Sequence, residues 1–343
     1  MKAAVFKKVG EPLVVEDIAD PEPDPRGLVV KVAYCGVCGT DLHATREGLT
    51  TACCGQVLGH EYVGEIVDVG SRAEGDWQVG DRVCAMPFIA CGRCPACAVG
   101  RFFECQDKKV AGVDAPGGFA EYVATGARET LRLPDGLDLQ RAALVEPLAV
   151  GLHAVRVADL KAGSRAMVIG AGPIGLTVAQ WAGFCGAREV VVSEPAPSRA
   201  ALASKMGATR VIRPDPAGGS EQLLAQFIDA AGGPPDVIFE CVGAPGLLQQ
   251  CIEMAPQRGR IVPVGVCEQP DRIMPFFGLI KELRIQFAIA YTRDDFETCL
   301  AMLAAQRIDV SAMVTDVVGL DELPQAFEAL RTPGHQCKVL TRI

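Results

Sequence analysis

The sequence lacks long uncharged apolar runs, although 49% of its 343 residues are hydrophobic. No run approaches the 18 residues that suggest a membrane-spanning helix, so we expect no membrane segment. The N-terminal residues include lysines but no long apolar core, which argues against a secretory signal. Because fifteen cysteines occur without such a signal, we expect reduced thiols and metal ligation in a cytoplasmic protein rather than disulfides.

An excess of positive charge is also lacking, since the formal net charge is −9. A general nucleic-acid binder normally carries a basic face, so we expect no nucleic-acid partner. Histidine is scarce, with four in the whole chain, and the sequence has neither internal repeats nor low-complexity tracts. The length suggests two domains, and the hydrophobic content is ample for two packed cores.

Four cysteines lie close together in the run CGRCPACAVGRFFEC, whose spacing is C-x2-C-x2-C-x7-C. The short steps let neighbouring thiolates converge on one ion, and the longer last step brings the chain back for a fourth ligand. Four sulfurs form a closed tetrahedral site, the form that a structural zinc takes. The alternative of four unrelated cysteines is disfavoured by the tight spacing and by the Gly, Pro and Arg in the run. The predicted ligands are Cys91, Cys94, Cys97 and Cys105.

The first part of the chain contains short β-prone runs separated by Gly, Pro and Asp turns. Irregular short strands at this spacing predict a β-barrel-like domain. The expected strands are residues 3–6, 13–18, 28–33, 61–69 and 82–86.

Strands and helices alternate from residue 152 onward, which predicts a parallel, doubly wound sheet. We expect the C-terminal tail to fold back on the first domain. The predicted α/β protein therefore has one domain of residues 1–151, completed by 292–343, and a second domain of residues 152–291. The expected strands of the second domain are residues 166–169, 189–193, 236–241, 260–264 and 283–290.

A glycine-rich string, Gly-Ala-Gly-Pro-Ile-Gly, joins the first strand of the second domain to a helix. It has the G-x-G-x-x-G pattern in the strand–turn–helix context of a dinucleotide-binding loop. The glycines allow a tight turn and a close approach to a pyrophosphate, which the free N–H groups of the helix N-terminus attract. A proline in the first turn of the helix costs nothing, because no N–H is needed there. The predicted cofactor-binding residues are Gly170, Gly172, Pro173, Ile174 and Gly175.

Glu194 follows the next strand, 19 residues beyond the last glycine. A carboxylate at this point can accept hydrogen bonds from both ribose hydroxyls of NAD and would repel a 2′-phosphate. Arg199 is close enough in sequence to cover the adenine or to contact a phosphate. We therefore predict NAD as the cofactor, with NADP as the less favoured alternative.

Two further strings carry a thiol and an imidazole: CGVCGTDLH at residues 35–43 and GHEYVG at residues 59–64. Cys38 and His60 offer ligand types that zinc prefers. Asp41 and Glu61 could orient these ligands, or Glu61 could bind a metal directly. Taken singly, such a cysteine or histidine is more often part of a core, so the combination carries the argument.

These strings, the four-cysteine run and the glycine-rich loop occur in the order typical of the zinc-dependent medium-chain alcohol dehydrogenase family, which the sequence resembles over essentially its whole length. The resemblance implies a GroES-like catalytic domain beside a Rossmann domain, with the active site in the cleft between them. It also implies two zinc ions per chain. Cys38 and His60 would bind the catalytic ion, and the four-cysteine run would bind the structural one.

The family resemblance implies a glutamate as the third ligand of the catalytic zinc. The string Leu-Val-Glu-Pro-Leu-Ala at residues 144–149 resembles the polyol branch of the family, which includes sorbitol, 2,3-butanediol and threonine dehydrogenases. In that branch Glu61 and Glu146 can exchange as the ligand, or one of them can hold a zinc-bound water. We favour Glu146 as the ligand and treat Glu61 as its competitor.

The implied reaction is hydride transfer from an alcohol to NAD, with zinc as the Lewis acid that lowers the pKa of the alcohol. Thr40 is placed to take the substrate proton, and its alternative role is a helix N-cap. His43 lies three residues further along the same helical face, where it can pass the proton to solvent. The alternative for His43 is an ordinary solvent-facing position.

The residues after the last Rossmann strand bear on the substrate. Where sorbitol dehydrogenases carry an Arg-Tyr pair, this chain has Ala290-Tyr291, so the arginine that holds polyol hydroxyls is missing. We expect a secondary alcohol or vicinal diol, or the matching ketone, and treat a sorbitol- or threonine-type substrate as the alternative. The family also suggests a homo-oligomer, a dimer or a tetramer. A non-catalytic relative is disfavoured, because such proteins lack these zinc ligands.

Overall fold

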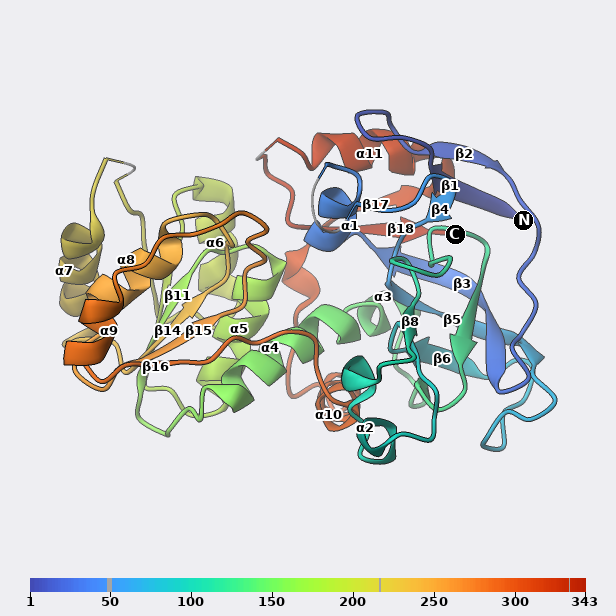
Figure 1. Ribbon diagram of the computed structural model, residues 1–343, viewed down its shortest axis with the longest axis horizontal. Coiled ribbons are helices and arrows are strands. Elements are labelled where there is room, and N and C mark those ends of the chain that lie inside the picture. Colours follow the sequence, from blue (N-terminus) through green and yellow to red (C-terminus); the bar gives the residue numbers. More distant parts are fainter. Residues whose placement is uncertain (48–50, 216, 333) are drawn as a thin grey trace. The chain divides into compact units, whose positions relative to one another are not determined.

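The computed structural model describes residues 1–343 apart from 48–50, 216 and 333. The chain forms two compact units, residues Met1–Glu146 with Tyr291–Ile343, and residues Pro147–Ala290 (Figure 1). It passes from one unit to the other within helix α4 (Val145–Val157) and returns after Ala290. Among the described residues, no helix is long and apolar enough to cross a membrane.

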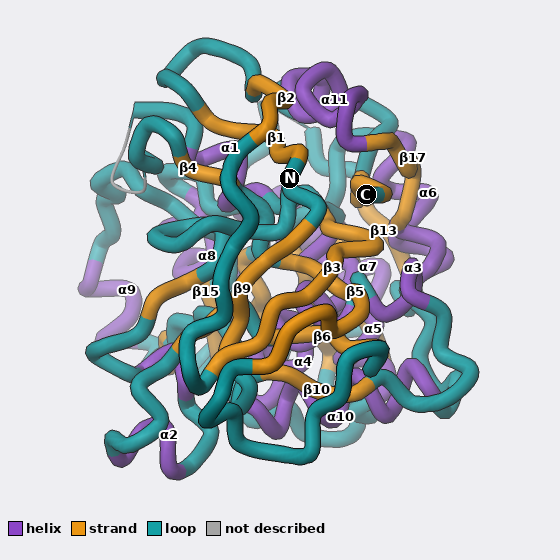
Figure 2. Tube along the Cα trace, turned by 90° about the vertical axis from the view of Figure 1, so that its right-hand side faces the viewer, coloured by secondary structure: helices purple, strands orange, loops and turns teal. Residues whose placement is uncertain are grey.

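The main sheet of the first unit is built around β3 (Gly27–Gly36), in the order β10-β6-β5-β3-β18-β17, with β9 also paired to β3. Figure 2 shows β9, β3, β5, β6 and β10 as neighbouring strands. The last strand of the chain, β18 (Lys338–Arg342), pairs antiparallel with β3 and parallel with β17, so the C-terminal tail completes this sheet. The other strands are β5 (Glu61–Val69), β6 (Arg82–Ala85), β9 (Tyr122–Gly126), β10 (Thr130–Arg132) and β17 (Val314–Gly319).

Small elements surround this sheet and its core, which includes the fully buried Phe6, Leu28, Ile66, Phe119 and Phe327. A second sheet has the order β2-β1-β4, and β7 pairs with β8. The strands are β1 (Lys2–Phe6), β2 (Val14–Asp17), β4 (Gln56–Val57), β7 (Phe88–Ile89) and β8 (Lys109–Val110). The helices are α1 (Gly39–Ala44), α2 (Pro95–Ala98), α3 (Leu139–Ala142), α10 (Arg293–Ala304) and α11 (Leu323–Ala329), with 3-10 turns at Phe102–Glu104, Ser311–Met313 and Leu320–Glu322.

The second unit contains a parallel sheet in the order β13-β12-β11-β14-β15-β16. Its central strands are continuous apolar runs, because helices cover both faces of a parallel sheet of this kind. The strands are β11 (Arg165–Ile169), β12 (Glu189–Ser193), β13 (Arg210–Ile212), β14 (Val237–Glu240), β15 (Arg260–Pro263) and β16 (Arg284–Ile285). The helices are α5 (Pro173–Phe184), α6 (Pro197–Lys205), α7 (Ser220–Ala231), α8 (Leu247–Met254) and α9 (Pro275–Ile280).

The strand predicted at residues 283–290 is wrong in length, since β16 covers only Arg284–Ile285. Gln286 and Ala288 still donate backbone hydrogen bonds to Ile261 and Pro263 of β15. The apolar side chains that suggested a buried strand point outward instead, because Phe287 is 66% exposed and β16 is the edge of the sheet. An alternation of apolar residues cannot distinguish a central strand from an edge.

Candidate metal and cofactor sites

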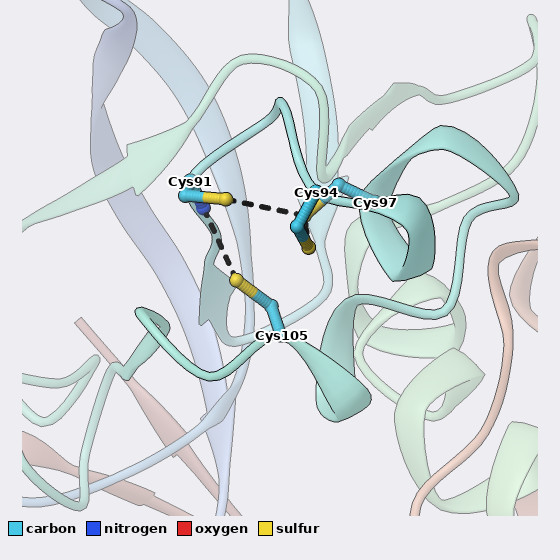
Figure 3. A group of neighbouring side chains, drawn as sticks. All are labelled: Cys91, Cys94, Cys97 and Cys105. Atoms are coloured by element: carbon cyan, nitrogen blue, oxygen red, sulfur yellow. Dashed lines mark hydrogen bonds between the residues drawn. The ribbon is translucent and has the colours of Figure 1, made fainter.

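The four predicted cysteines converge on one point in the first unit (Figure 3). Their sulfurs lie within 4.8 Å of one another, with Sγ–Sγ distances of 3.9 Å from Cys91 to Cys97 and 3.4 Å from Cys94 to Cys97. A tetrahedral zinc with bonds of about 2.3 Å would separate its sulfurs by about 3.8 Å. The four thiols therefore fit a closed zinc site without rearrangement of the backbone.

Local structure holds the cysteines in this arrangement. Cys94 is the N-cap of α2, and Cys105 follows a 3-10 turn. The backbone N–H groups of Arg93 and Cys94 lower the pKa of the Cys91 thiol to about 6, which favours the thiolate that binds metal. Arg26 Nη1 donates to the carbonyl oxygen of Cys91 at 3.0 Å and ties the lobe to the start of β3.

A second group of possible metal ligands joins Cys38, His60 and Glu61. Cys38 is the N-cap of α1, so the alternative of an N-cap role for Thr40 is wrong. His60 directly precedes β5, and Glu61 is its first residue. The ligand atoms of the three side chains lie within 4.8 Å of one another, and His60 and Glu61 are buried. One thiolate, one imidazole and one carboxylate are a donor set that fits zinc and leaves a position open.

Asp41 holds the two ligand-bearing segments together and is 1% exposed. Its Oδ2 accepts from the Cys38 N–H at 2.9 Å, and its Oδ1 accepts from the Gly59 N–H at 3.1 Å. Oδ1 also lies 3.4 Å from His60 Nδ1. Burial alone would lower the pKa of His60, but Asp41 and Cys38 together raise it well above its ordinary value. Asp41 and Cys38 therefore favour a positive charge beside them.

Glu146 lies outside the group formed by Cys38, His60 and Glu61. It is in the first turn of α4, near enough to His60 and Glu61 for their charges to act on it. Loss of hydration raises the pKa of Glu146 to about 7; His60 opposes this shift and Glu61 adds to it. Tyr291 faces this carboxyl group, and burial together with Glu146 raises the pKa of the Tyr291 hydroxyl.

The predicted proton relay lies on α1. Thr40 Oγ1 is 3.7 Å from Cys38 Sγ, and His43 follows one helical turn later; both side chains are half-buried. The Thr40 hydroxyl therefore lies beside the Cys38 thiol.

Lys338 is the site residue that sequence reasoning missed. Its Nζ lies 2.7 Å from both carboxylate oxygens of Glu61, and the lysine is 1% exposed. The two residues are 277 positions apart in the chain, so no local motif connects them. The signal that could have found it is a lysine at the start of an apolar closing strand, Lys-Val-Leu.

The predicted dinucleotide loop joins β11 to α5. Gly170 has a φ of +95°, and Gly172 is the N-cap of the helix, with Pro173 in its first turn and the half-buried Ile174 after it. A Cβ on Gly175 would lie 2.0 Å from the Gly170 carbonyl oxygen. Gly170 and Gly175 are therefore required by the backbone conformation and close packing of the turn, whereas a Cβ on Gly172 would meet open space.

Glu194 follows β12 and contacts this loop. Its carboxylate is 5% exposed, and it accepts from the Ala171 N–H at 2.8 Å and from the Ala196 N–H at 2.9 Å. Each oxygen keeps a second lone pair, so the carboxylate can still accept from ribose hydroxyls. Nearby on α6, Arg199 has a buried Nε that makes no hydrogen bond to any described residue.

Comparison with known proteins identifies the family. Residues 24–135 match the alcohol dehydrogenase GroES-like domain, and residues 173–305 match the zinc-binding dehydrogenase family. A 2-dehydro-3-deoxy-L-galactonate 5-dehydrogenase from Pseudoalteromonas atlantica is 37% identical over 89% of this chain and 88% of that protein. The (R,R)-butanediol dehydrogenase of Bacillus subtilis is 35% identical over 100% of this chain and 99% of that protein.

Solved structures agree with this assignment. The 2R,3R-butanediol dehydrogenase from Bacillus subtilis has a TM-score of 0.87 at 33% identity, covering 100% of this chain and 99% of that one. A zinc-binding dehydrogenase from Sinorhizobium meliloti 1021, bound to NADP, has a TM-score of 0.89 at 33% identity with the same coverage. The predicted α/β fold, with a GroES-like and a Rossmann-type part, is confirmed. The chain belongs to the zinc-dependent medium-chain alcohol dehydrogenase family and is an alcohol oxidoreductase.

Proposed function

We propose that this enzyme interconverts a secondary alcohol or vicinal diol and the matching ketone, with NAD as the hydride carrier and a zinc at Cys38, His60 and a glutamate. The observation that carries the proposal is the Cys38–His60–Glu61 group, with Cys38 half-buried and the other two residues buried, whose ligand atoms lie within 4.8 Å of one another. Zinc bound there would supply the Lewis acid that lowers the pKa of the alcohol.

The side chains around the site have distinct tasks in this reaction. Asp41 fixes the orientation of His60 and the backbone of Cys38. Thr40 accepts the proton of the substrate hydroxyl, and His43 passes that proton toward solvent. The glycine-rich loop would hold NAD, which would supply the hydride acceptor. As the third metal ligand we propose Glu146, with Glu61 as the competitor.

The direct test combines metal analysis with a substrate panel. About two zinc ions per chain and turnover of butane-2,3-diol or simple secondary alcohols with NAD would support the proposal. Equal or better turnover of sorbitol or threonine would instead support the polyol or amino-alcohol alternative. The panel should include both butanediol enantiomers and the sugar acid that the Pseudoalteromonas relative is named for.

The apolar packing around the Tyr291 ring supports the simple-alcohol substrate class. Its ring stacks on Phe296 with a centroid distance of 5.5 Å and lies 5.9 Å from Phe88. Position 290, next to this tyrosine, is alanine, so the arginine that a polyol site would use there is missing. A substrate with several hydroxyls would leave some of them without partners, at a cost of about 1–3 kcal/mol each.

We propose NAD rather than NADP because the buried Glu194 carboxylate lies against the dinucleotide loop and would repel a 2′-phosphate. Arg199 favours the alternative, NADP, because its Nε has no hydrogen-bond partner among the described residues and could be directed to a 2′-phosphate. The ratio of kcat/KM for NAD to that for NADP measures the preference. An Arg199→Leu variant should lose any residual NADP activity and keep NAD activity.

We further propose a homo-oligomer assembled through the edge of the second unit. Exposed apolar side chains gather around β16 and α9, including Phe276 at 60%, Leu279 at 75% and Ile289 at 63% exposure. An edge strand with exposed apolar neighbours is a ready surface for pairing with a second copy. Light scattering should give a dimer or tetramer, and Leu279→Glu should shift it toward the monomer. The cytoplasmic location stays a prediction.

A further inference from the structure

Arg331 links the end of α11 to the end of α1, the helix that carries the proposed proton relay. Its Nε donates to Glu328 Oε2 at 2.7 Å, and its Nη2 donates to Glu328 Oε1 at 3.0 Å. The same Nη2 donates to the hydroxyl oxygen of Thr45, the C-cap of α1, at 2.8 Å. Arg331 and Thr45 are 286 positions apart in the chain. The proposed reaction gives this arginine no task.

The Thr45 hydroxyl closes the C-terminal turn of α1. Its Oγ1 lies 3.1 Å from the Leu42 carbonyl oxygen and 3.4 Å from the Asp41 carbonyl oxygen, and Thr45 is 2% exposed. A hydroxyl has one hydrogen and two lone pairs, so a bond accepted from Arg331 leaves its hydrogen free for these carbonyl groups. The positive charge also favours the C-terminal end of a helix. Because α1 has six residues and a helix this short is marginal alone, its end depends on such contacts.

The same part of α11 packs toward the segment that carries His60. The Arg331 guanidinium lies over the ring of Phe327, 5.5 Å from its centroid. Phe327 is fully buried and meets Phe119 edge-on, with 6.5 Å between the ring centroids. The Phe119 ring occupies the space over Gly59, where a Cβ would lie 2.6 Å from it. The α11 region therefore supports both segments that supply candidate metal ligands.

Different groups hold the two ends of α1. At its start, Asp41 accepts from the Cys38 N–H at 2.9 Å, which fixes the candidate metal ligand. At its far end the contact comes from Arg331, and Thr40 and His43 lie between the two points. Loss of Arg331 would therefore release the far end of the helix while the Asp41 contact to Cys38 remains. Transfer of a proton between side chains is sensitive to displacements of about 1 Å.

We infer that Arg331 is a positioning residue that acts through Thr45 to hold Thr40 and His43 in place for proton transfer. The inference rests on the proposed function, because it requires a proton path from the substrate through these two side chains. It gives a residue near the C-terminus a part in proton transfer but no part in metal binding. Rate and zinc content should therefore respond differently to its removal.

The experiment compares Arg331→Met with Arg331→Lys and with Arg342→Met, a matched control at an exposed arginine of β18. Arg331→Met should keep about two zinc ions, lower kcat about 10-fold and change KM for the alcohol by less than about twofold. The solvent deuterium isotope effect on kcat should rise. Arg331→Lys keeps the charge and should recover part of kcat, and Arg342→Met should match the wild type.

Hydrogen exchange measures the position of α1 independently of turnover. Arg331→Met should raise the exchange rates of the amides of residues 39–45 at least about 10-fold, because the end of the helix is released. Exchange in residues 166–184 of the second unit should not change, which controls for a general loss of stability.

A double variant tests whether Arg331 acts through the relay. His43→Gln should also lower kcat, and adding Arg331→Met should lower it little further, because both changes affect one proton path. Unchanged kcat in Arg331→Met, additive losses in the double variant, unchanged exchange in residues 39–45 or loss of the catalytic zinc would each overturn the inference. A wild-type protein that oxidises none of the alcohols would instead overturn the proposed function, and the exchange rates would still show whether Arg331 holds α1.

Discussion

The four-cysteine site and the Cys38–His60 site hold their metal ligands by different means. The four cysteines come from one short segment, Cys91 to Cys105, and their sulfurs lie within 4.8 Å of one another. The Cys38–His60–Glu61 group draws Cys38 from the N-cap of α1 and the other two residues from the start of β5. Asp41 and Lys338 make hydrogen bonds to members of this group. A closed site made locally stabilises a lobe, whereas an open site made from distant segments can admit a substrate.

The largest expected difference between the two sites appears on removal of Cys38. Cys38→Ser should lower kcat/KM by at least about 1,000-fold, because the Lewis acid is lost, and should leave about one zinc per chain. The melting temperature should hardly change. Cys54→Ser is the control, since this exposed thiol belongs to neither site. Full turnover in Cys38→Ser would break the assignment of the catalytic site.

The four-cysteine site should respond in stability rather than in rate. Cys97→Ser should lower the free energy of unfolding by at least about 3 kcal/mol, because a structural zinc contributes folding free energy directly. Calorimetry measures this loss. Turnover per catalytic zinc in the remaining folded protein should stay near the wild-type value. If the Cys97→Ser protein were as stable as the wild type, the four-cysteine site would have no structural role.

Glu129, a buried residue next to the four-cysteine lobe, should make the stability of the protein depend on pH. Burial raises the pKa of this carboxyl group to about 7, and its Oε1 accepts from the Ala90 N–H beside the four-cysteine lobe. The folded state thus keeps a proton that the unfolded chain releases, so stability falls as pH rises from about 4.5 to about 7. Glu129→Gln removes this loss, which is worth about 3 kcal/mol.

Melting temperatures of the wild type and Glu129→Gln at pH 5 and pH 8 measure this effect. The variant should gain stability relative to the wild type only at the higher pH. Other titrating groups are shared by both proteins and cancel in the difference. A constant difference between the two proteins at both pH values would show that the Glu129 carboxyl group is ionised throughout.

The smallest expected effect concerns Asp41, which touches the ligands of the open site. Asp41→Asn keeps the size of the side chain but weakens its hold on His60, and should reduce zinc affinity or kcat/KM by about 10- to 100-fold. Zinc titration with a competing chelator measures the affinity. The four-cysteine zinc should be unaffected, which serves as an internal control. Loss of both ions would indicate a general folding defect instead.

Short-range features of the protein were predictable. The four-cysteine cluster and the strand–glycine turn–helix of residues 166–184 depend on spacing within a few residues, and the structure has both. Helix α1 was anticipated only as a helical face, and its N-cap is Cys38 rather than Thr40. The edge strand β16 of the parallel sheet in the second unit was predicted too long, because apolar alternation does not reveal which strand lacks a neighbour.

The sequence by itself determined which residue types can bind a metal, since sulfur and imidazole donors are set by composition and close spacing. Only the tertiary structure decided how the carboxylates around Cys38 and His60 are distinguished. Lys338 reaches Glu61 across β3 through the space above Gly36, while Glu146 lies beside Tyr291 with no ion pair among the described residues. This ion pair joins residues 277 positions apart on two strands, β5 and β18, that both pair with β3, and local patterns carry no information about it.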